Sequence, residues 1–289
     1  MKTKSLYKNP EAKQILMNLY DSKMDSLGLG YEDLYLDTFA GETHVIKTGD
    51  DSKPPIVLLH GINAGAPVAI EPLKELAEDY LIYAIDTIGQ ATKSAQTRLD
   101  LANNDYGKWL SEMFDQLGIE KASVVAASYG GFLLQKLIIS NPEKVSKAIF
   151  VVPAGFGNGG FIESTKMLTL PLIKFMISKK ESDLRNFMSS FHNQIDDYWI
   201  SFQKNTLTGV NMDYRRPPIL KKEQVENFSA PVYLMVAEND VFFPAKHATE
   251  KCTSYFKNFK EVHTLKNSKH IPEPSQFEEI QSVIRGWLK

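Results

Sequence analysis

The residues with the clearest potential for joint chemistry are a serine, an acid and a histidine, each placed after an apolar run. Ser128 follows residues 122–127, acids follow residues 231–237, and His270 comes shortly after the run at about 260–265. A nucleophilic serine, an orienting acid and a histidine base in this chain order are typical of hydrolases that form an acyl-enzyme. The order therefore predicts acyl transfer through a serine.

The neighbours of Ser128 are those of a nucleophile elbow, a sharp turn from a strand into a helix. Such a turn needs minimal side chains two residues before and two after the serine, because the backbone passes close to itself. Ala126 and Gly130 occupy these positions, with Ala126 in place of the usual first glycine. A helix starting after Ser128 would direct its positive end at the developing negative charge. We predict Ser128 as the nucleophile.

The general base is predicted at His270, in a loop after the last strand and before the final amphipathic helix. A base in that loop can come within hydrogen-bond reach of the serine. Four other histidines occupy less suitable places in the predicted elements: His44 in a hairpin, His192 in a helical region, His247 in a helix and His263 in a strand. The acid has two candidates, Glu238 and Asp240, which both follow the strand at 231–237.

Apolar runs alternate with helical patterns along most of the chain. Strands are predicted at 55–60, 80–86, 122–127, 147–153, 231–237 and about 260–265, and helices at about 67–78, 105–117, 130–140, 244–256 and 274–288. This alternation indicates a parallel sheet covered on both faces, with ligands at the carboxyl ends of the strands. Two further strands, at about 32–38 and 43–48, predict an antiparallel edge hairpin, and a leading helix is expected before residue 30.

The alternation stops between residues 155 and 228, where the pattern becomes helical. We therefore predict a catalytic domain formed by residues 1–154 and 229–289, with residues 155–228 as a helical cap inserted after the sixth of eight strands. Its apolar residues are candidates either for the cap's own core or for the wall of a substrate pocket. They include Phe161, Met167, Leu168, Leu172, Phe175, Met176, Phe187, Met188, Phe191, Tyr198 and Trp199.

Taken together, these ordered motifs resemble those of the α/β-hydrolase fold superfamily, over roughly residues 31 to 289. The segments 43–49, 83–89 and 106–110 are similar to bacterial carboxylesterases of the naproxen-esterase type. The resemblance implies a mostly parallel eight-stranded sheet flanked by helices, and it places the acid at Asp240 through the segment 237–244. Some members carry the acid one strand earlier, but residues 153–158 contain no carboxylate. Lys269 stands where a glycine is common in this superfamily.

An oxyanion formed during acyl transfer needs two backbone donors. One is expected from Tyr129, directly after the nucleophile, and the other from the loop after His60-Gly61, at Ile62. His60 is interpreted as a residue that shapes this loop. Because the segment 60–63 lacks the additional glycines of the HGGG type, we expect a narrow hole and slow turnover of tertiary-alcohol esters.

A cofactor or metal is not expected. Residues 155–160 match the G-x-G-x-x-G pattern of dinucleotide sites, but no second strand with a terminal acid follows at the required distance. No two histidines have helical metal-ligand spacing, and the single Cys252 provides no thiol partner. A lone cysteine and the lack of an apolar leader favour a cytoplasmic location.

Composition is consistent with one large core and a small substrate. The chain has 289 residues, 43% of them hydrophobic, with 33 basic and 35 acidic side chains. This balance disfavours nucleic-acid or membrane partners and favours a small ester with an apolar acyl or alcohol part. The sequence leaves the oligomeric state open.

The prediction is a cofactor-free serine esterase of the carboxylesterase type. A serine at the elbow, in place of an aspartate, disfavours haloalkane dehalogenase and epoxide hydrolase chemistry. Thioesterase, lactonase, amidase, carbon-carbon hydrolase and perhydrolase activities stay open, because fold does not determine substrate. An alternative from another class is a slow-turnover binding protein whose cap holds a small apolar ligand.

Overall fold

One eight-stranded sheet organises the molecule. The computed structural model describes residues 5–160, 162 and 165–289. The strand order is β1-β2-β4-β3-β5-β6-β7-β8, antiparallel between β1, β2 and β4 and parallel from β4 to β8. The strands are β1 (Tyr31–Thr38), β2 (Gly41–Thr48), β3 (Pro55–Leu59), β4 (Leu81–Ile85), β5 (Ala122–Ala127), β6 (Val145–Val151), β7 (Val232–Ala237) and β8 (Phe259–Leu265). The predicted parallel sheet and edge hairpin are confirmed.

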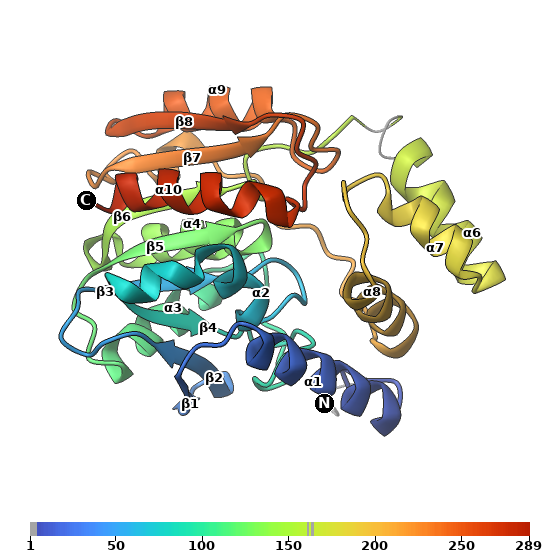
Figure 1. The fold of residues 1–289 in the computed structure, drawn as a ribbon. Coiled ribbons are helices and arrows are strands. Elements are labelled where there is room, and N and C mark those ends of the chain that lie inside the picture. The colour runs from blue at the N-terminus through green and yellow to red at the C-terminus, as the bar shows by residue number, and fades with distance from the viewer. Residues whose placement is uncertain (1–4, 161, 163–164) are drawn as a thin grey trace.

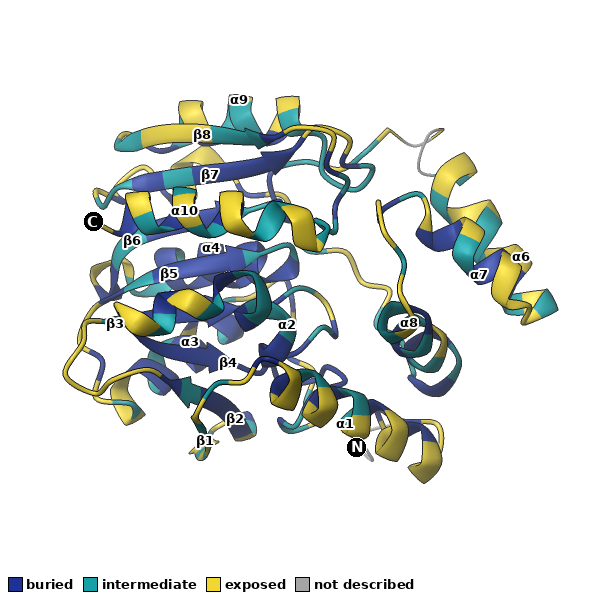
Figure 2. Cartoon of the chain, in the orientation of Figure 1, coloured by how far each residue is buried: buried dark blue, intermediate teal, exposed yellow. Residues whose placement is uncertain are grey.

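Helices cover both faces of this sheet (Figure 1). On one face lie α2 (Ala66–Ile70), the 3₁₀ helix η1 (Glu71–Glu78) and α10 (Phe277–Leu288), and on the other lie α3 (Asp105–Gln116), α4 (Tyr129–Ser140) and α9 (Ala245–Tyr255). Because successive strand residues point to opposite faces, Val124 joins the core with α4 while Val125 joins the core with α10. Figure 2 shows these central strands as mostly buried.

The helix predicted at 67–78 is divided in the structure. The α-helix α2 ends at Ile70, and the tighter helix η1 continues from Glu71 to Glu78. Pro72 has no backbone N–H to donate to the carbonyl four residues earlier, so the α-helical ladder cannot pass through it. The predicted helix at 274–288 likewise begins with a short 3₁₀ turn, η5 (Pro274–Gln276), before α10.

Three helices between β6 and β7 stand beyond one end of the sheet (Figure 1). They are α6 (Leu170–Ser178), α7 (Glu181–Met188) and α8 (Asp197–Gly209). Phe175 and Met188 are buried in a core of their own, which also packs against Ile271 near the predicted base. The leading helix α1 (Pro10–Ser26) contacts α8. Phe161, a predicted cap residue, lies outside the described residues.

Within the described ranges, no helix is both long enough and apolar enough to cross a bilayer.

Candidate active site

Ser128 sits on a strained turn between β5 and α4. Its φ of 52° and ψ of −114° lie in a region that a side-chain-bearing residue seldom adopts. The backbone around it fixes this conformation: its N–H donates to the carbonyl of Val151 at 2.9 Å, and its carbonyl accepts from the amides of Gly131 and Ala154, both at 2.9 Å. A strained residue held by three hydrogen bonds is typical of functional turns.

Position 130 of the turn has no room for a side chain. A Cβ at this position would lie 2.3 Å from the carbonyl oxygen of Leu59, a distance that no side chain tolerates. The loop after β3 also lies beside the serine, where a Cβ on Gly61 would make an ordinary van der Waals contact with Ser128 Cβ at 3.4 Å. The glycine at position 130 therefore lets the strand β3 and the helix α4 converge at the serine.

The structure brings Ser128, His270 and Asp240 into one hydrogen-bonded chain. His270 Nε2 lies 3.0 Å from Ser128 Oγ, and His270 Nδ1 lies 2.8 Å from Asp240 Oδ2. The three residues are separated by up to 142 positions in sequence and follow β5, β7 and β8. The arrangement lets one imidazole nitrogen accept the serine proton while the other donates to the carboxylate.

Asp240 is fixed by its own turn. Its second oxygen, Oδ1, accepts from the backbone amides of Phe242 and Phe243 at 2.8 and 3.0 Å. The rings of the same two phenylalanines flank the His270 imidazole, with centroids 4.9 and 5.5 Å away. Glu238, the other candidate acid, instead binds Lys266 and the amide of Asn267 at the surface.

Ile62 and Tyr129 lie on the two segments that meet at Ser128. Tyr129 is the first residue of α4, so its N–H has no acceptor within the helix. Ile62 follows Gly61 in the loop after β3 and lines the same cavity as Ser128. This placement is the one expected for two oxyanion donors.

Buried polar groups support the loop that contains Ile62. His60 Nε2 accepts from the amide of Thr87 at 2.9 Å, and Asp86 Oδ1 accepts from the amide of Ala66 at 2.8 Å. Burial lowers the pKa of His60, with Asp86 and the Gly61 carbonyl acting in the opposite direction. A neutral His60 that accepts a backbone hydrogen bond shapes the loop.

Known proteins with similar chains are carboxylesterases and other α/β hydrolases. The family model described as alpha/beta hydrolase fold matches residues 54–194. The chain is 26% identical over 276 residues to the uncharacterized carboxylesterase nap of Bacillus subtilis (strain 168), covering 91% of this chain and 89% of that protein. It is 22% identical to carboxylesterase YbfK of the same organism, covering 93% and 92% of the two chains.

A solved structure gives the same result for the fold. The crystal structure of naproxen esterase (carboxylesterase NP) from Bacillus subtilis superposes with a TM-score of 0.84 at 22% identity, covering 98% of this chain and all of that one. The protein has the α/β-hydrolase fold. The sequence motifs predicted a resemblance to carboxylesterases of the naproxen-esterase type, and these comparisons confirm that resemblance.

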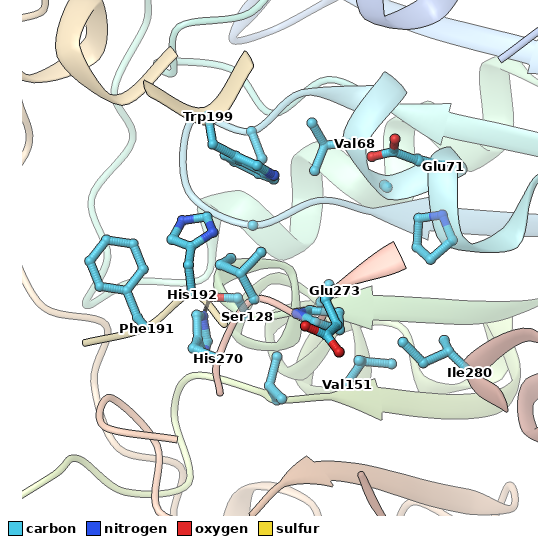
Figure 3. Close-up of a pocket in the computed structure, with 18 of the residues that line it drawn as sticks. Val68, Glu71, Ser128, Val151, Phe191, His192, Trp199, His270, Glu273 and Ile280 are labelled. Carbon is cyan, nitrogen blue, oxygen red and sulfur yellow. Dashed lines mark hydrogen bonds between the residues drawn. The ribbon is translucent and has the colours of Figure 1, made fainter. Parts of the chain in front are cut away.

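A cavity of about 340 Å³ opens beside Ser128 and His270. Figure 3 shows Ser128 and His270 at its middle, with Trp199 and His192 on one side and Val151 and Ile280 on another. Of the cap residues predicted as possible wall, Phe187, Phe191 and Trp199 line it. Leu168, Leu172 and Met176 instead pack against the cap's own core.

Two polar cavity residues were not predicted as part of the site. His192 is buried in the wall, and its Nδ1 has no partner among the described residues. Burial first, and then the charges of His270 and Lys269, lower its pKa to about 3, so its ring is neutral. Lys23 reaches the cavity from α1, where it pairs with Glu71 at 2.8 Å. No sequence motif marks either residue, because both arrive through long-range packing.

Proposed function

We propose that this protein is a carboxylesterase that works through a Ser128-His270-Asp240 triad and an acyl-enzyme. The observation that supports this most strongly is the hydrogen-bonded chain from Ser128 Oγ to His270 Nε2 at 3.0 Å and from His270 Nδ1 to Asp240 Oδ2 at 2.8 Å. Relatedness to two curated carboxylesterases supports ester cleavage. The geometry suits a nucleophile and a base in the cavity wall, at Ser128 and His270, with Asp240 behind them as the orienting acid.

In the first half-reaction, Ser128 Oγ bonds to the ester carbonyl carbon while its proton moves to His270 Nε2. The carbonyl π electrons move to oxygen and form a tetrahedral oxyanion. When this intermediate collapses, the bond to the alcohol oxygen breaks and the imidazolium gives its proton to the departing alcohol. The acyl group is then an ester of Ser128.

In the second half-reaction, water bonds to the acyl carbon and gives a proton to His270 Nε2. The new oxyanion collapses, the bond to Ser128 Oγ breaks, and the serine regains the proton from His270. The carboxylic acid leaves, so one ester and one water give one acid and one alcohol. Asp240 keeps Nδ1 protonated and steadies the imidazolium without taking its proton.

The oxyanion in both steps is assigned to the backbone N–H groups of Ile62 and Tyr129. Ser128 lies between the two segments that carry them, and a helix N-terminus such as that of α4 favours negative charge. Loss of one donor of this kind raises the barrier by about 3 to 4 kcal/mol. The short segment 60–63 leaves a narrow hole, which predicts slow turnover of tertiary-alcohol esters.

We also propose the division into a catalytic domain, residues 1–154 and 229–289, and a cap, residues 155–228. Under this division the cap supplies Phe187, Phe191, His192 and Trp199 to the cavity wall. A wall with these side chains suits a small, largely apolar ester.

The test is turnover of p-nitrophenyl butyrate together with intact-mass spectrometry of the quenched reaction. We expect a butyryl adduct on the wild type and neither turnover nor adduct with Ser128→Ala. Glu238→Gln, which removes the neighbouring surface acid, serves as the control and is expected to keep both. Saturable ester binding without turnover in folded wild type would contradict the proposal and favour a binding protein.

A further inference from the structure

His192 is a buried histidine of the cavity wall that the triad does not use. The residue is 2% exposed and lines the same cavity as Ser128 and His270. Neither of its ring nitrogens has a hydrogen-bond partner among the described residues, and Nδ1 is fully enclosed. Because Nε2 is not enclosed, it is the nitrogen that faces the cavity. A buried polar group without a protein partner is unfavourable, so a ligand group is expected to meet it.

Aromatic packing fixes the His192 ring. Its centroid lies 4.9 Å from the ring of Phe191 and 4.9 Å from the ring of Trp199, at interplanar angles of 50° and 62°. The backbone N–H of His192 donates to the carbonyl of Met188 at 2.9 Å, at the end of α7. A ring packed between two aromatic side chains keeps its direction. One fixed polar group in a largely apolar wall is typical of a specificity contact.

The cap holds His192 beside the His270 loop. Residues 192 and 271 form a parallel β-bridge, and the amide of Ile271 donates to the carbonyl of Phe191 at 2.9 Å. The ring of Phe242 connects the two sides, with its centroid 5.3 Å from the Phe191 ring and 4.9 Å from the His270 ring. Figure 3 shows the two imidazoles next to each other. A group that leaves past His270 therefore passes His192.

The surroundings of His192 disfavour a role as a second general base. Burial, and then the charges of His270 and Lys269, lower the pKa of His192 to about 3. The Ser128 hydroxyl contacts His270 Nε2, and His192 lacks a carboxylate such as the one that orients His270. The ring is therefore neutral at neutral pH, with one N–H donor and one acceptor nitrogen.

The direction of the reaction places the alcohol part of the ester against His192. His270 gives its proton to the departing alcohol, so the alcohol oxygen lies beside the His270 ring. The ammonium group of Lys269 is already bound to the carbonyls of Ser189 and His192, at 2.7 and 3.3 Å. A neutral imidazole does not compensate for the burial of a charged group, and a methyl group would leave it unpaired. A hydroxyl suits either tautomer, because it can both donate and accept.

We propose that His192 determines specificity for the alcohol part and that the preferred substrates are monoesters of small diols. This proposal rests on the proposed esterase function and adds the substrate class. In the complex, the ester oxygen lies beside His270 and the second hydroxyl of the alcohol part hydrogen-bonds to His192 Nε2. The short hydrocarbon segment between these two oxygens lies against the rings of Phe191 and Trp199, which line the same wall.

The first experiment compares kcat/KM within two pairs of butyrate esters, n-propyl with 2-hydroxyethyl and n-butyl with 3-hydroxypropyl, by titration of the released acid. In each pair a hydroxyl replaces a methyl of similar size. Wild type is expected to prefer the hydroxylated ester by at least about tenfold in one pair, because a site built for a hydroxyl discriminates against its methyl analogue. His192→Phe keeps a ring but removes both nitrogens, so the preference should reverse. His192→Gln restores a polar group near the position of Nε2 and should recover part of it.

The matched control is His247→Phe, the same change at an exposed position of α9 outside the cavity wall, and it should keep the wild-type preference. Equal turnover within both pairs by wild type would overturn the role of His192 and leave the esterase function intact. An unchanged hydroxyl preference in folded His192→Phe would overturn it too, as would an equal loss for all four esters, which a purely structural role would give. If His192→Phe does not fold, His192→Leu is held to the same criteria.

A binding measurement separates the hydroxyl site from the chemistry. The four esters are titrated into Ser128→Ala protein and followed by calorimetry. We expect at least one hydroxylated ester to bind more tightly than its methyl analogue, and this gain to disappear in the Ser128→Ala, His192→Phe double variant. This result without turnover by wild type would contradict the esterase proposal alone, whereas equal binding within both pairs would contradict the hydroxyl site.

Discussion

Two histidines in this protein each contact a carboxylate through Nδ1, yet their surroundings give them different functions. His270 Nδ1 lies 2.8 Å from Asp240, and its Nε2 lies 3.0 Å from the Ser128 hydroxyl. His44 Nδ1 lies 2.9 Å from Asp86, and its Nε2 lies 2.7 Å from a second carboxylate, Asp33. The difference between the two sites is the group on Nε2.

A hydroxyl can donate a hydrogen bond to an imidazole nitrogen, whereas an ionised carboxylate can only accept one from it. The hydroxyl of Ser128 can donate its proton, which leaves His270 Nε2 free to act as a base. Ionised carboxylates only accept, so the ring nitrogens of His44 act as the donors in these two contacts. His44 therefore joins β2 to β1 and to the end of β4, as a structural ion cluster. An Asp-His contact alone does not identify a catalytic site.

Removal of the His270 imidazole is expected to have the largest effect on activity. His270→Ala is expected to lower kcat by about a million-fold, because the His270 imidazole is the only hydrogen-bond partner of Ser128 Oγ among the described residues. The measurement is steady-state hydrolysis of p-nitrophenyl butyrate by protein whose fold is verified by circular dichroism. Turnover within an order of magnitude of wild type would show that His270 is not the base.

Asp240→Asn should have the next largest effect, lowering kcat by about 10⁴-fold. The amide keeps the size of the side chain but can present an N–H to His270 Nδ1, which favours the wrong tautomer. Binding of 3-hydroxypropyl butyrate to the variant, measured by calorimetry, is expected to match its binding to Ser128→Ala protein. A parallel loss of binding and turnover would mean that Asp240 acts mainly by holding the site together.

His44→Ala is expected to lower the stability of the fold and to leave the turnover rate unchanged. Removal of the His44 imidazole leaves Asp86 fully buried without this partner, which is expected to lower the free energy of unfolding by about 3 kcal/mol. Urea denaturation measures this change, and turnover per folded molecule is expected to persist. Abolished turnover in folded His44→Ala would contradict the division between a structural and a catalytic histidine.

Acid should weaken the structural cluster. Burial alone would raise the pKa of Asp86, but the hydrogen bond and charge of His44 outweigh it, so the folded-state pKa lies below the ordinary value of 3.8. A depressed folded-state pKa gives stability that is present above the unfolded pKa and is lost as the pH falls further. Wild-type stability should therefore decline below about pH 4. Asp86→Asn should flatten this decline in urea titrations run across the same range.

Glu238→Gln should have the smallest effect. Glu238 belongs to the same segment as Asp240, but it contacts Lys266 and the amide of Asn267 at an exposed surface. Exposed pairs contribute little to stability, so neither the urea midpoint nor kcat should change measurably. A large fall in kcat would mean that the acid had been assigned to the wrong residue of the pair.

The sequence predicted the triad because its chemistry depends on local patterns. Small residues around Ser128, acids after one strand and a histidine after the next are visible in the printed chain. The Asp33-His44-Asp86 cluster was not predicted, because its contacts join β1, β2 and the segment after β4 across 11 and 42 positions. No local signal distinguishes these residues from other polar residues of a strand or of the turn that follows it.

The part of the cavity wall that the sheet and α10 form was not predicted from the sequence, for a related reason. Val125 and Ile280 have the periodicity of ordinary core residues, and nothing in their spacing shows that the two layers leave a gap. Lys23 reaches the cavity from the leading helix, which was predicted only to pack on the outside, and His192 reaches it from the cap segment between α7 and α8. Periodicity predicts which face of an element is buried, but a cavity depends on how two faces fit together.

The most direct test of the central claim is labelling of the purified protein with a fluorophosphonate probe at neutral pH, mapped by mass spectrometry. We expect one adduct on Ser128, its loss in Ser128→Ala and His270→Ala, and its retention in folded His44→Ala. This result would place the reactive Asp-His pair at His270 and the structural pair at His44. An unlabelled Ser128 in folded wild type, or an adduct on another residue, would contradict the claim.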